Sequence, residues 1–361
     1  MHPHGNRGTA TAFRLTKEAS AMRKTIYDVA KDMNLSPGTI SKILNHSGSI
    51  GAATRDRVLR YVKDIGFVAE SSARILKSKY SYTIGVVFSD ISLVGLEHPF
   101  FGSIIQHFKN YVEREGYEIV FITSKIGQHE MSYLDWCRNK KVNGVFVVSG
   151  NINNAYIREL VASSLPCVSS DIIIPGMHSV LSDDEQGVRL AFEHLLGLGI
   201  RDIGVLAGPQ TTRAFMDRLA AYHRLMEEHG IPLRPEWIRE SSGFGYTSAF
   251  RTTQDWLAAT ASFPKAVLAQ SDDIAFGLIH ALQQNGVRIP EDVSVIGFDD
   301  INFARLFSPT LTTIRQDRQS IGETSARLLI DFMGHGNGKG TTVDRIPVEL
   351  VVRTSTCAPH P

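Results

Sequence analysis

Short apolar segments alternate with amphipathic segments over most of this chain, and this alternation restricts the possible folds more than any other feature. Segments typical of buried strands recur in two series, at 82–89, 118–123 and 144–149 and then at 203–207, 266–269 and 293–298. Segments with a helical spacing of apolar residues separate them, among them 186–197 and 273–284. Strands that alternate with helices form parallel sheets covered on both faces. The sequence therefore predicts an α/β body made of two doubly wound lobes.

A ligand site is expected where the two lobes meet. In doubly wound sheets, ligands bind beyond the carboxyl ends of the strands. With two such lobes, this position is the cleft between them, and clefts of this kind commonly bind small molecules.

Residues 25–45, TIYDVAKDMNLSPGTISKILN, have the pattern of two short helices joined by a tight turn. Apolar residues give this unit its inner face, and they are Ile26, Val29, Ala30, Leu35, Ile40, Ile43 and Leu44. Ser36 suits the N-cap of the second helix, and Pro37 suits its first position, where no N–H donor is needed. In a helix-turn-helix, residues at this end of the second helix face the base edges of the major groove.

A third helix is predicted at 52–65. There, Val58, Tyr61, Val62 and Ile65 recur at helical spacing and can close a small core over the first two helices. The sequence thus predicts an all-α head at the amino-terminal end of the α/β body.

Charge is distributed unevenly along the chain. Of 38 Lys and Arg and 37 Asp and Glu, residues 1–80 carry 14 and 6, which leaves 24 and 31 for the other residues. The head is therefore basic and the body acidic. Phosphates attract the cations of the head, whereas nucleic acid repels an acidic body. The plain alternative is a helical hairpin with no role in DNA binding, and this asymmetry argues against it.

Residues 67–80, FVAESSARILKSKY, connect the head to the body and allow two interpretations. The segment is short, basic and rich in small residues, as linkers are. It also suits a short hinge helix whose Leu76 side chain wedges between base steps from the minor groove. Composition supports the two interpretations equally.

Length and composition restrict the class of protein. A chain of 361 residues with 43% hydrophobic and 21% charged residues is typical of a soluble protein of two or three domains. Its three cysteines form no CxxC pair and support neither a disulfide framework nor a zinc site. No apolar run reaches the roughly 18 residues of a membrane helix, and no secretion signal precedes the head. We expect a cytoplasmic protein with no membrane partner.

A series of short motifs follows the head in a fixed order. They are HPFF at 98–101, SDDEQG at 182–187, LAGP at 206–209, SDDIAFG at 271–277, VSVIGFDD at 293–300 and PTLTTIRQD at 309–317. Together with the helix-turn-helix, this series resembles the lactose/galactose repressor family of bacterial regulators from about residue 22 to 356. The resemblance implies a body like the periplasmic sugar-binding proteins. It also implies a homodimer, or a higher oligomer, that reads a palindromic operator and responds to a small effector in the cleft.

The resemblance also implies which residues contact DNA. They are Thr25, Tyr27, Ser36, Pro37, Gly38, Thr39, Ser41, Lys42 and Asn45 in the head, and Ala73 and Leu76 in the hinge. The family's base-reading positions fall on Pro37, Gly38 and Lys42. Pro37 and Gly38 cannot make a bidentate base contact, so direct readout would rest on Lys42, on Thr39 and on Pro37 against a thymine methyl. A phosphate contact for Lys42 is equally open, and the Pro-Asn pair usual in the hinge is replaced here by Ala69 and Glu70.

Six positions match effector-binding positions of the family. They are Phe101, Asp171, Arg218, Phe244, Ser271 and Asp299. A guanidinium supplies several fixed donors, and carboxylates accept from hydroxyl groups, so this set suits a polyhydroxylated molecule, with a sugar favoured. Some sugar-responsive members carry amides where this chain has Val148 and Ser271, which leaves a sugar phosphate or a nucleoside open.

We expect the following organisation. Residues 1–21 form a disordered tail, with Met22 as a possible true start, followed by the head at 22–67 and the hinge at 68–81. The effector-binding and dimerisation body covers 82–357. Its N-lobe is expected at about 82–183 and 317–343, and its C-lobe at about 184–316 and 344–357.

The predicted function is that of a sequence-specific DNA-binding regulator, a repressor controlled by a small molecule, without cofactor or metal. The adjacent aspartates at 183–184, 272–273 and 299–300 resemble metal ligands, but capping of the next helix explains the first two pairs better. No HExxH, GxSxG or Walker motif supports catalysis. The alternative is a cytosolic α/β sugar-modifying enzyme with a fused helical domain, which would need a catalytic base in the cleft.

Overall fold

The computed structural model describes residues 24–44, 49–67, 80–88, 95–335 and 340–359. The chain divides into two compact units, residues 1–81, which contain the head, and residues 82–361, which form the body. The predicted tail, Asn45 and the hinge residues Ala73 and Leu76 lie outside the described residues. None of the described helices combines the length and apolar character needed to cross a lipid bilayer.

The head contains three helices, α2 (Ile26–Met33), α3 (Pro37–Leu44) and α4 (Ala52–Asp64). Its buried core consists of Val29, Ala30, Ile40, Ile43 and Val58. The other apolar residues singled out in the sequence pack around this core. The helical spacing predicted from the sequence is therefore confirmed.

Polar side chains fix where the first two helices of the head begin. Thr25 and Asp28 form a capping box, in which Asp28 N donates to Thr25 Oγ1 at 3.3 Å and Thr25 N donates to Asp28 Oδ2 at 2.7 Å. Ser36 Oγ accepts from Thr39 N at 3.1 Å, so α3 begins at Pro37 as predicted. Tyr61 of α4 donates to Asp32 of α2 at 2.6 Å and joins the two helices.

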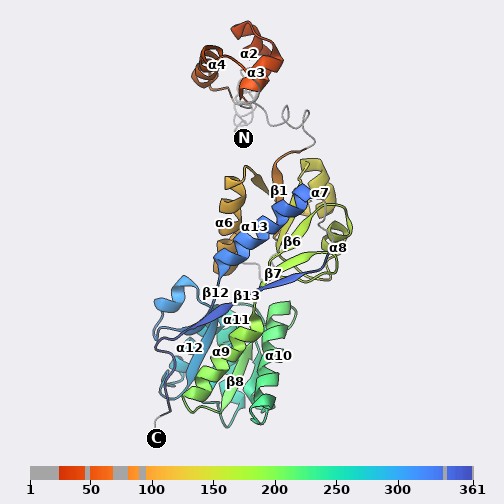
Figure 1. Cartoon of the computed structure of the whole chain (residues 1–361). Coiled ribbons are helices and arrows are strands. Elements are labelled where there is room, and N and C mark those ends of the chain that lie inside the picture. Colours follow the sequence, from red (N-terminus) through yellow and green to blue (C-terminus); the bar gives the residue numbers. More distant parts are fainter. Residues whose placement is uncertain (1–23, 45–48, 68–79, 89–94, 336–339, 360–361) are drawn as a thin grey trace, which may run out of the picture. The chain divides into compact units, whose positions relative to one another are not determined.

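The N-lobe is built on a sheet of six parallel strands in the order β13-β7-β6-β5-β1-β2. The strands are β1 (Thr83–Phe88), β2 (Glu118–Ile122), β5 (Gly144–Ser149), β6 (Cys167–Ser169), β7 (His178–Ser182) and β13 (Val343–Ile346). Its helical segments are η1 (Gly95–Glu97), α6 (Pro99–Arg114), α7 (Tyr133–Lys140), α8 (Ala155–Ala162) and α13 (Arg318–His335). Helices α6 and α13 pack together on one face, and α7 and α8 cover the other (Figure 1). A small hairpin of β3 (Lys125–Ile126) and β4 (His129–Glu130) follows β2.

The C-lobe sheet has the order β14-β12-β11-β10-β8-β9 and is parallel except for β14. The strands are β8 (Ile203–Ala207), β9 (Ile238–Glu240), β10 (Ala266–Ala269), β11 (Ser294–Asp299), β12 (Thr312–Gln316) and β14 (Val348–Val351). Its helical segments are α9 (Asp184–Gly197), α10 (Arg213–Glu228), η2 (Pro235–Trp237), α11 (Tyr246–Ala259), α12 (Asp272–Gln284) and η3 (Asn302–Arg305). Helices α9 and α10 pack on one face of the sheet, and α11 and α12 pack on the other. The prediction of two parallel-sheet lobes is therefore correct.

The chain crosses between the lobes three times, and the third crossing differs from its predicted place. The first two follow β7 and β12, near the expected residues 183 and 316. The N-lobe was expected to end near residue 343, but the strand that begins at Val343 pairs with β7 and stays in the N-lobe sheet to Ile346. The chain crosses only at Pro347, because the unpaired edge of β7 offers backbone partners to an added strand.

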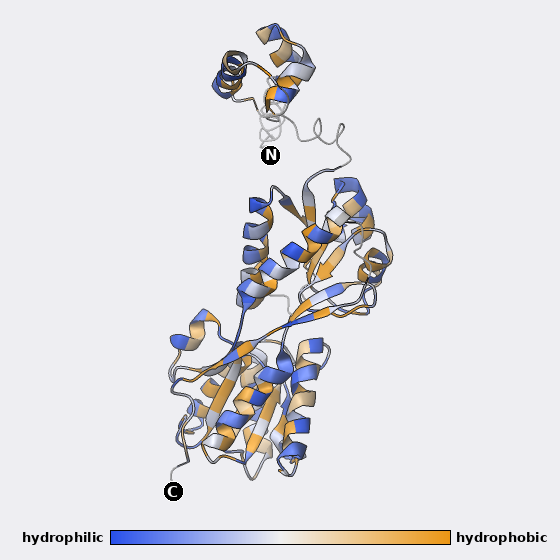
Figure 2. Ribbon diagram, viewed as in Figure 1, coloured by the Kyte–Doolittle hydropathy of each residue, from blue (hydrophilic) through white to orange (hydrophobic). Residues whose placement is uncertain are grey.

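Hydropathy follows the layers of the body. In Figure 2 the strands carry most of the apolar residues, and the helices carry polar residues on their outer sides. The fully buried side chains include Phe108 and Phe146, whose rings stack at 4.1 Å between α6 and the N-lobe sheet. Burial of such faces provides the main favourable free energy of folding.

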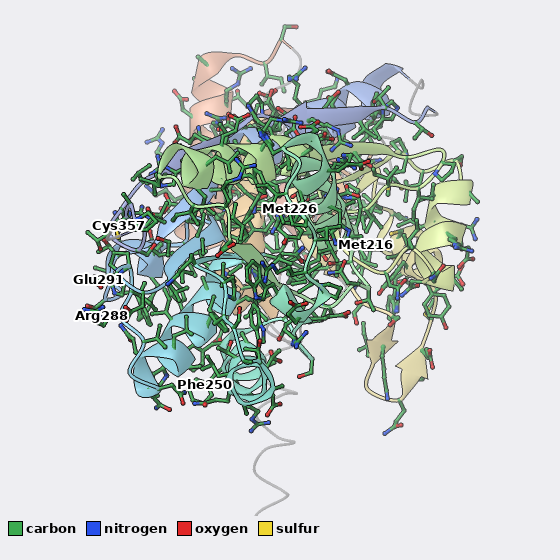
Figure 3. The ribbon with its side chains drawn as sticks, turned by 90° about the horizontal axis from the view of Figure 1, so that it is seen from below. Met216, Met226, Phe250, Arg288, Glu291 and Cys357 are labelled. Atoms are coloured by element: carbon green, nitrogen blue, oxygen red, sulfur yellow. The ribbon has the colours of Figure 1, made fainter. Side chains whose placement is uncertain are left out.

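The carboxyl-terminal segment returns along β11 and completes the C-lobe. Ser355 Oγ donates to Val295 O at 2.6 Å, and Val295 N donates to Ser355 O at 2.8 Å. Beyond it, Cys357 lies near Glu291 and Arg288 at one edge of the lobe (Figure 3). Cys357 and the buried Cys137 and Cys167 are free thiols.

Close packing of α11 against α12 predicts a strong effect of a single methyl group. A Cβ atom added at Gly277 of α12 would clash with the backbone of Tyr246 and lie 2.8 Å from Phe250 N. Gly277→Ala should therefore lower the free energy of unfolding by about 1–3 kcal/mol in a denaturant melt.

Gly197→Ala is the matched control, because a Cβ at this α9 position meets no atom within 4 Å. This control should be neutral or slightly stabilising, since alanine favours helix over glycine. Equal stability of the two variants would contradict the close packing.

Candidate functional site

A cavity of about 690 Å³ lies between the two lobes. Several of its polar residues stand where strands end. Ser149 ends β5, Asp171 follows β6, Asp299 ends β11 and Gln316 ends β12. The carboxyl edges of both sheets thus meet around one cavity, as the sheet topology predicts.

All six residues predicted from the sequence to bind an effector line this cavity. They are Phe101, Asp171, Arg218, Phe244, Ser271 and Asp299. The structure brings them together from both lobes, although they span almost 200 positions of the chain. Effector binding by these residues remains a prediction.

Further lining residues were not predicted from the sequence. They are His98, Phe100, Ser149, Thr212, Ala214, Phe215, Asp273 and Gln316. A search for the last residue of each predicted strand would have found Ser149. Gln316 ends β12, which was not among the predicted strands. His98 is the tenth residue after the end of β1, so no strand-end pattern points to it.

Arg218 is a buried cation whose donors are already partly engaged. Its Nε donates to Asp184 Oδ1 at 2.8 Å, and its Nη1 donates to the Gln270 carbonyl at 2.5 Å. Its guanidinium lies over the Phe298 ring, 3.6 Å from the ring centroid. Its Nη2 makes no hydrogen bond within the part of the chain that the structure describes. Arg218 therefore has one donor nitrogen left for a molecule in the cavity.

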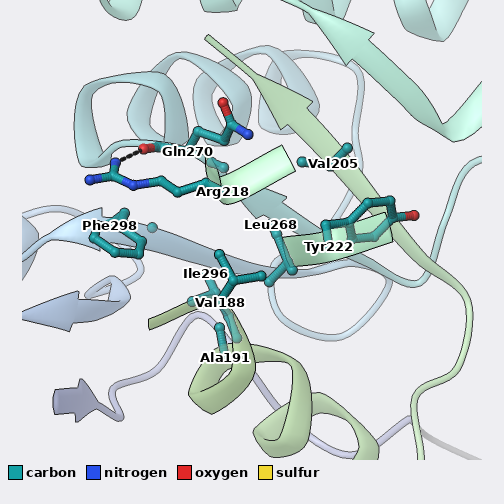
Figure 4. A pocket seen from close by; sticks show the side chains of 11 residues that line it. Val188, Ala191, Val205, Arg218, Tyr222, Leu268, Gln270, Ile296 and Phe298 are labelled. Atoms are coloured by element: carbon teal, nitrogen blue, oxygen red, sulfur yellow. Dashed lines mark hydrogen bonds between the residues drawn. The ribbon is translucent and has the colours of Figure 1, made fainter. Parts of the chain in front are cut away.

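A second, smaller cavity of about 310 Å³ lies behind Arg218 (Figure 4). Its lining is mostly apolar, with Val188, Val205, Leu268 and Ile296 among its members. Arg218 lines both cavities. On that side the Gln270 carbonyl is the acceptor of the guanidinium (Figure 4).

Ser271 and Asp272 correct the expectation that both Asp272 and Asp273 cap a helix. Ser271 is the N-cap of α12, since its Oγ accepts from Ile274 N at 3.2 Å. Asp272 is fully buried and accepts from Ile301 N at 2.8 Å and from Thr313 Oγ1 at 2.5 Å. Asp272 therefore fixes the loop after β11, and Asp273 lines the cavity. For the first pair the expectation is correct for Asp183, which caps α9, and wrong for Asp184, which binds Arg213 and Arg218.

The turn at Asp299 and Asp300 is conformationally strained. Their φ angles are 125° and 50°, in a region that residues other than glycine seldom adopt. Gln316 Nε2 donates to Asp299 Oδ1 at 2.5 Å, and Arg353 Nη2 donates to Asp300 Oδ1 at 2.6 Å. These bonds hold the Asp299 carboxyl at the cavity wall.

Burial raises the pKa of all three carboxyls that line the cavity. For Asp171, burial is opposed by Arg213 and by the hydrogen bond from Ser149 at 2.8 Å. For Asp273, burial is opposed by His98. For Asp299, burial raises the pKa to about 7, although Arg218 opposes it. Near neutral pH, the Asp299 carboxyl can therefore act as a donor or as an acceptor.

Aromatic rings provide apolar walls for the same cavity. Phe101 lies against His98 and Phe100, with ring centroids 4.9 and 5.1 Å apart. On the C-lobe side, Phe215 and Phe244 stack at 6.1 Å. Aromatic rings from both lobes, together with carboxyls and a guanidinium in the same lining, suit a ring-shaped molecule that has hydroxyl groups and an apolar face.

In the head, the predicted DNA contacts fall into two groups. Thr25, Ser36 and Thr39 make the caps of α2 and α3, and the Ser36 and Thr39 hydroxyls are 2.8 Å apart. By contrast, Tyr27 is 71% exposed, and Lys42 is exposed on α3. Pro37, Gly38 and Ser41 are partly exposed on the same helix. The exposed part of α3 therefore offers little but Lys42 as a long hydrogen-bonding side chain.

Comparison with known proteins identifies relatives of both units. The family described as bacterial regulatory proteins, lacI family, matches residues 25–70, and a periplasmic binding protein-like domain matches residues 192–356. The HTH-type transcriptional repressor PurR of Vibrio vulnificus is 31% identical over 334 residues, 91% of this chain and 97% of that protein. Catabolite control protein A of Priestia megaterium is 29% identical over 342 residues, 93% of this chain and 100% of that protein.

Similar solved structures cover almost the whole chain. The lac repressor dimer bound to operator and the anti-inducer ONPF has a TM-score of 0.80 and 28% identity, and the match covers 93% of this chain and 100% of that one. The complex of the transcriptional regulator CelR with cellobiose has a TM-score of 0.69 and 26% identity, with 92% and 100% covered.

The raised pKa of Asp299 predicts a pH dependence of stability. The folded pKa of about 7 lies above the ordinary value near 4, so the stabilisation is fully present below about pH 4 and is lost as the pH rises through about 7. When the pH rises from about 5.5 to 8, deprotonation of this residue should lower the free energy of unfolding of the wild type by about 2 kcal/mol. Asp299→Asn should remove that loss in urea melts at the two pH values.

Asp255→Asn, at an exposed position of α11, is the control and should follow the wild type. If Asp299→Asn follows the wild type as well, the Asp299 carboxyl does not take up a proton in the folded protein.

Proposed function

Since this chain belongs to the lacI family of bacterial regulatory proteins, we propose that an uncharged, polyhydroxylated effector of the sugar class binds between its lobes and controls its affinity for operator DNA. The protein is a DNA-binding transcriptional repressor, like its relatives. The named relatives are repressors or control proteins, and none of those named here is an enzyme.

The observation that carries the effector proposal is the chemistry of the interlobe cavity. Three carboxyls and Arg218 face it, between phenylalanine rings from both lobes. Carboxyls accept from hydroxyl groups, and the remaining guanidinium donor binds a hydroxyl or ring oxygen. A sugar satisfies these groups at once and leaves an apolar face for the rings.

The charge of the cavity argues against a phosphorylated effector. Arg218 is already paired with Asp184, whereas Asp171, Asp273 and Asp299 all face the cavity. A phosphate placed there would lie near three carboxyls, and His98 is the remaining basic side chain in the lining. The resulting repulsion and desolvation would oppose binding, because like charges interact strongly in a buried site.

Similar proteins with known ligands support the sugar class. The regulator CelR was solved with cellobiose, and a LacI family regulator from Enterococcus faecium was solved with bound ribose, at 26% identity and a TM-score of 0.65. Both are regulators with the same fold as this chain.

The head and the family together suggest how DNA is read. Two copies of the head on a homodimer would match a palindromic operator, and a similar structure is a repressor dimer on its operator. Within each head, Lys42 provides the longest donor on α3, so base discrimination rests mainly on it. The hinge residues Ala73 and Leu76 would add contacts in the minor groove.

The effector proposal predicts selective thermal stabilisation of the full chain. In a screen of neutral sugars, nucleosides and their phosphate esters, at least one neutral sugar should raise the melting temperature, because a ligand of the native state stabilises it. The phosphate ester of that sugar should not. Stabilisation by phosphorylated compounds alone would contradict the proposal.

Arg218→Lys should abolish the stabilisation by that sugar, since lysine keeps the charge beside Asp184 but loses the planar fork of donors. Arg189→Lys, in the exposed pair with Glu228, is the matched control and should keep it. If both variants respond like the wild type, Arg218 does not contact the effector.

The DNA-reading proposal predicts a loss of specificity in Lys42→Ala. A lost base contact costs about 1–3 kcal/mol on the correct sequence. Affinity for an operator selected from random duplexes should fall about tenfold or more at fixed salt, with a much smaller loss on random duplex. Lys31→Ala, at an exposed position of α2, should reduce both affinities alike. If Lys42→Ala weakens binding to the operator and to random duplex equally, Lys42 contacts a phosphate and does not read a base.

A further inference from the structure

Arg213 makes a direct polar contact between the lobes. It is the first residue of α10 in the C-lobe, and its Nε donates to the backbone carbonyl of Asp171 at 2.9 Å. Asp171 follows β6 of the N-lobe. The Arg213 side chain is only 16% exposed, so this bond is largely screened from water. One side chain thus joins the two lobes beside the cavity.

The guanidinium of Arg213 is held in place by its own lobe. Its Nη1 donates to Asp184 Oδ2 at 3.1 Å and to Asp217 Oδ2 at 2.5 Å. Asp184 is 1% exposed, and charge-assisted bonds in such surroundings are strong and directional. These two carboxylates set the direction in which Nε points, toward the N-lobe.

The contact lies beside the first chain crossing, because Arg213 Nη1 binds Asp184, the second residue after β7. It is farther from the second crossing, since β10 and β11 separate β8, which precedes Arg213, from the crossing strand β12. The donor and the acceptor of the Arg213 bond belong to different lobes, so a rotation of one lobe against the other changes their distance.

Both ends of the contact are connected to groups in the cavity. Asp184 binds Arg213 through Oδ2 and Arg218 through Oδ1, at 2.8 Å, and Arg218 faces the cavity. At the other end, the Asp171 carboxyl faces the cavity and accepts from Ser149. A molecule that binds Arg218 or Asp171 therefore acts on residues that hold the donor and the acceptor.

We infer that Arg213 is an interlobe latch. Its hydrogen bond to the Asp171 carbonyl stabilises the lobes in the arrangement of this structure. Through Asp184 and Asp171, the same residue couples that arrangement to the binding of a molecule in the cavity. Arg213 is a positioning residue, because it acts through these two aspartates and does not line the cavity. The latch requires neither a particular effector nor a particular operator.

The variants that test the latch are Arg213→Ala and Arg213→Lys in the full chain. Arg213→Ala leaves Asp184 paired with Arg218, so the buried carboxylate keeps a partner and the fold is retained. Arg189→Ala is the matched control, because it removes an arginine with a bidentate carboxylate partner inside the C-lobe.

The measurement is the distance distribution between spin labels, one in each lobe. Glu159→Cys on α8 and Glu227→Cys on α10 are exposed labelling sites, and Cys357→Ser removes the partly exposed thiol. Labelled protein is diluted with unlabelled protein, so that only distances within one chain contribute. No DNA or effector is added, so a failure here does not bear on the proposed function.

Arg213→Ala should broaden the interlobe distribution or shift it to longer distances, Arg213→Lys should fall between Arg213→Ala and the wild type, and Arg189→Ala should match the wild type. A distribution in Arg213→Ala that coincides with the wild type would overturn the latch.

Hydrogen exchange separates a latch from a general loss of stability. In Arg213→Ala, amides at 169–172 of the N-lobe should exchange faster, while those of β8 in the C-lobe keep the wild-type rate. Equal acceleration in both segments would assign Arg213 a structural role alone and would also overturn the inference.

Discussion

The buried carboxylate of Asp184 organises the region between the lobes. It is 1% exposed, and its two oxygens bind two arginines, Arg218 through Nε and Arg213 through Nη1. A single buried charge without a partner would cost several kcal/mol, so Asp184 requires at least one of these cations. Having two, it fixes Arg218 at the cavity wall and Arg213 against the N-lobe. The position of the cavity's cation and the Arg213 contact between the lobes thus share one physical origin.

The same carboxylate explains the electrostatic character of the cavity. Because Arg218 is neutralised by Asp184, the three carboxyls at Asp171, Asp273 and Asp299 face the cavity with little positive charge to balance them. Burial disfavours the charged form of these carboxyls and raises their pKa, to about 7 for Asp299. For this reason we propose a neutral, hydrogen-bonding effector rather than an anion. The amino-terminal part of the chain has the opposite charge, since residues 1–80 carry 14 basic and 6 acidic residues. The chain thus separates its DNA-binding charge from its ligand-binding charge.

Particular residues mark how far the site can be predicted from the sequence. Phe101, Asp171, Arg218, Phe244, Ser271 and Asp299 were placed by resemblance, and all of them line one cavity. Ser271 was expected to face a ligand, yet its hydroxyl also caps α12. Asp273 was expected to cap, yet it lines the cavity. Neighbouring polar residues at the start of a helix are interchangeable in a sequence pattern, and only the direction of each side chain decides which one turns to the cavity.

Sequence alone determined the two units, the six strands and the helices named from their apolar spacing, and the basic character of the head. These features depend on the spacing of apolar residues and on net charge, both of which are local properties of the chain. Tertiary structure decided that the strand beginning at Val343 stays in the N-lobe sheet, that Arg218 is paired with Asp184, and that Arg213 reaches the carbonyl of Asp171. Each of these depends on contacts between residues at least 29 positions apart. No local pattern encodes such contacts, because they form only when the sheets and helices have been brought together.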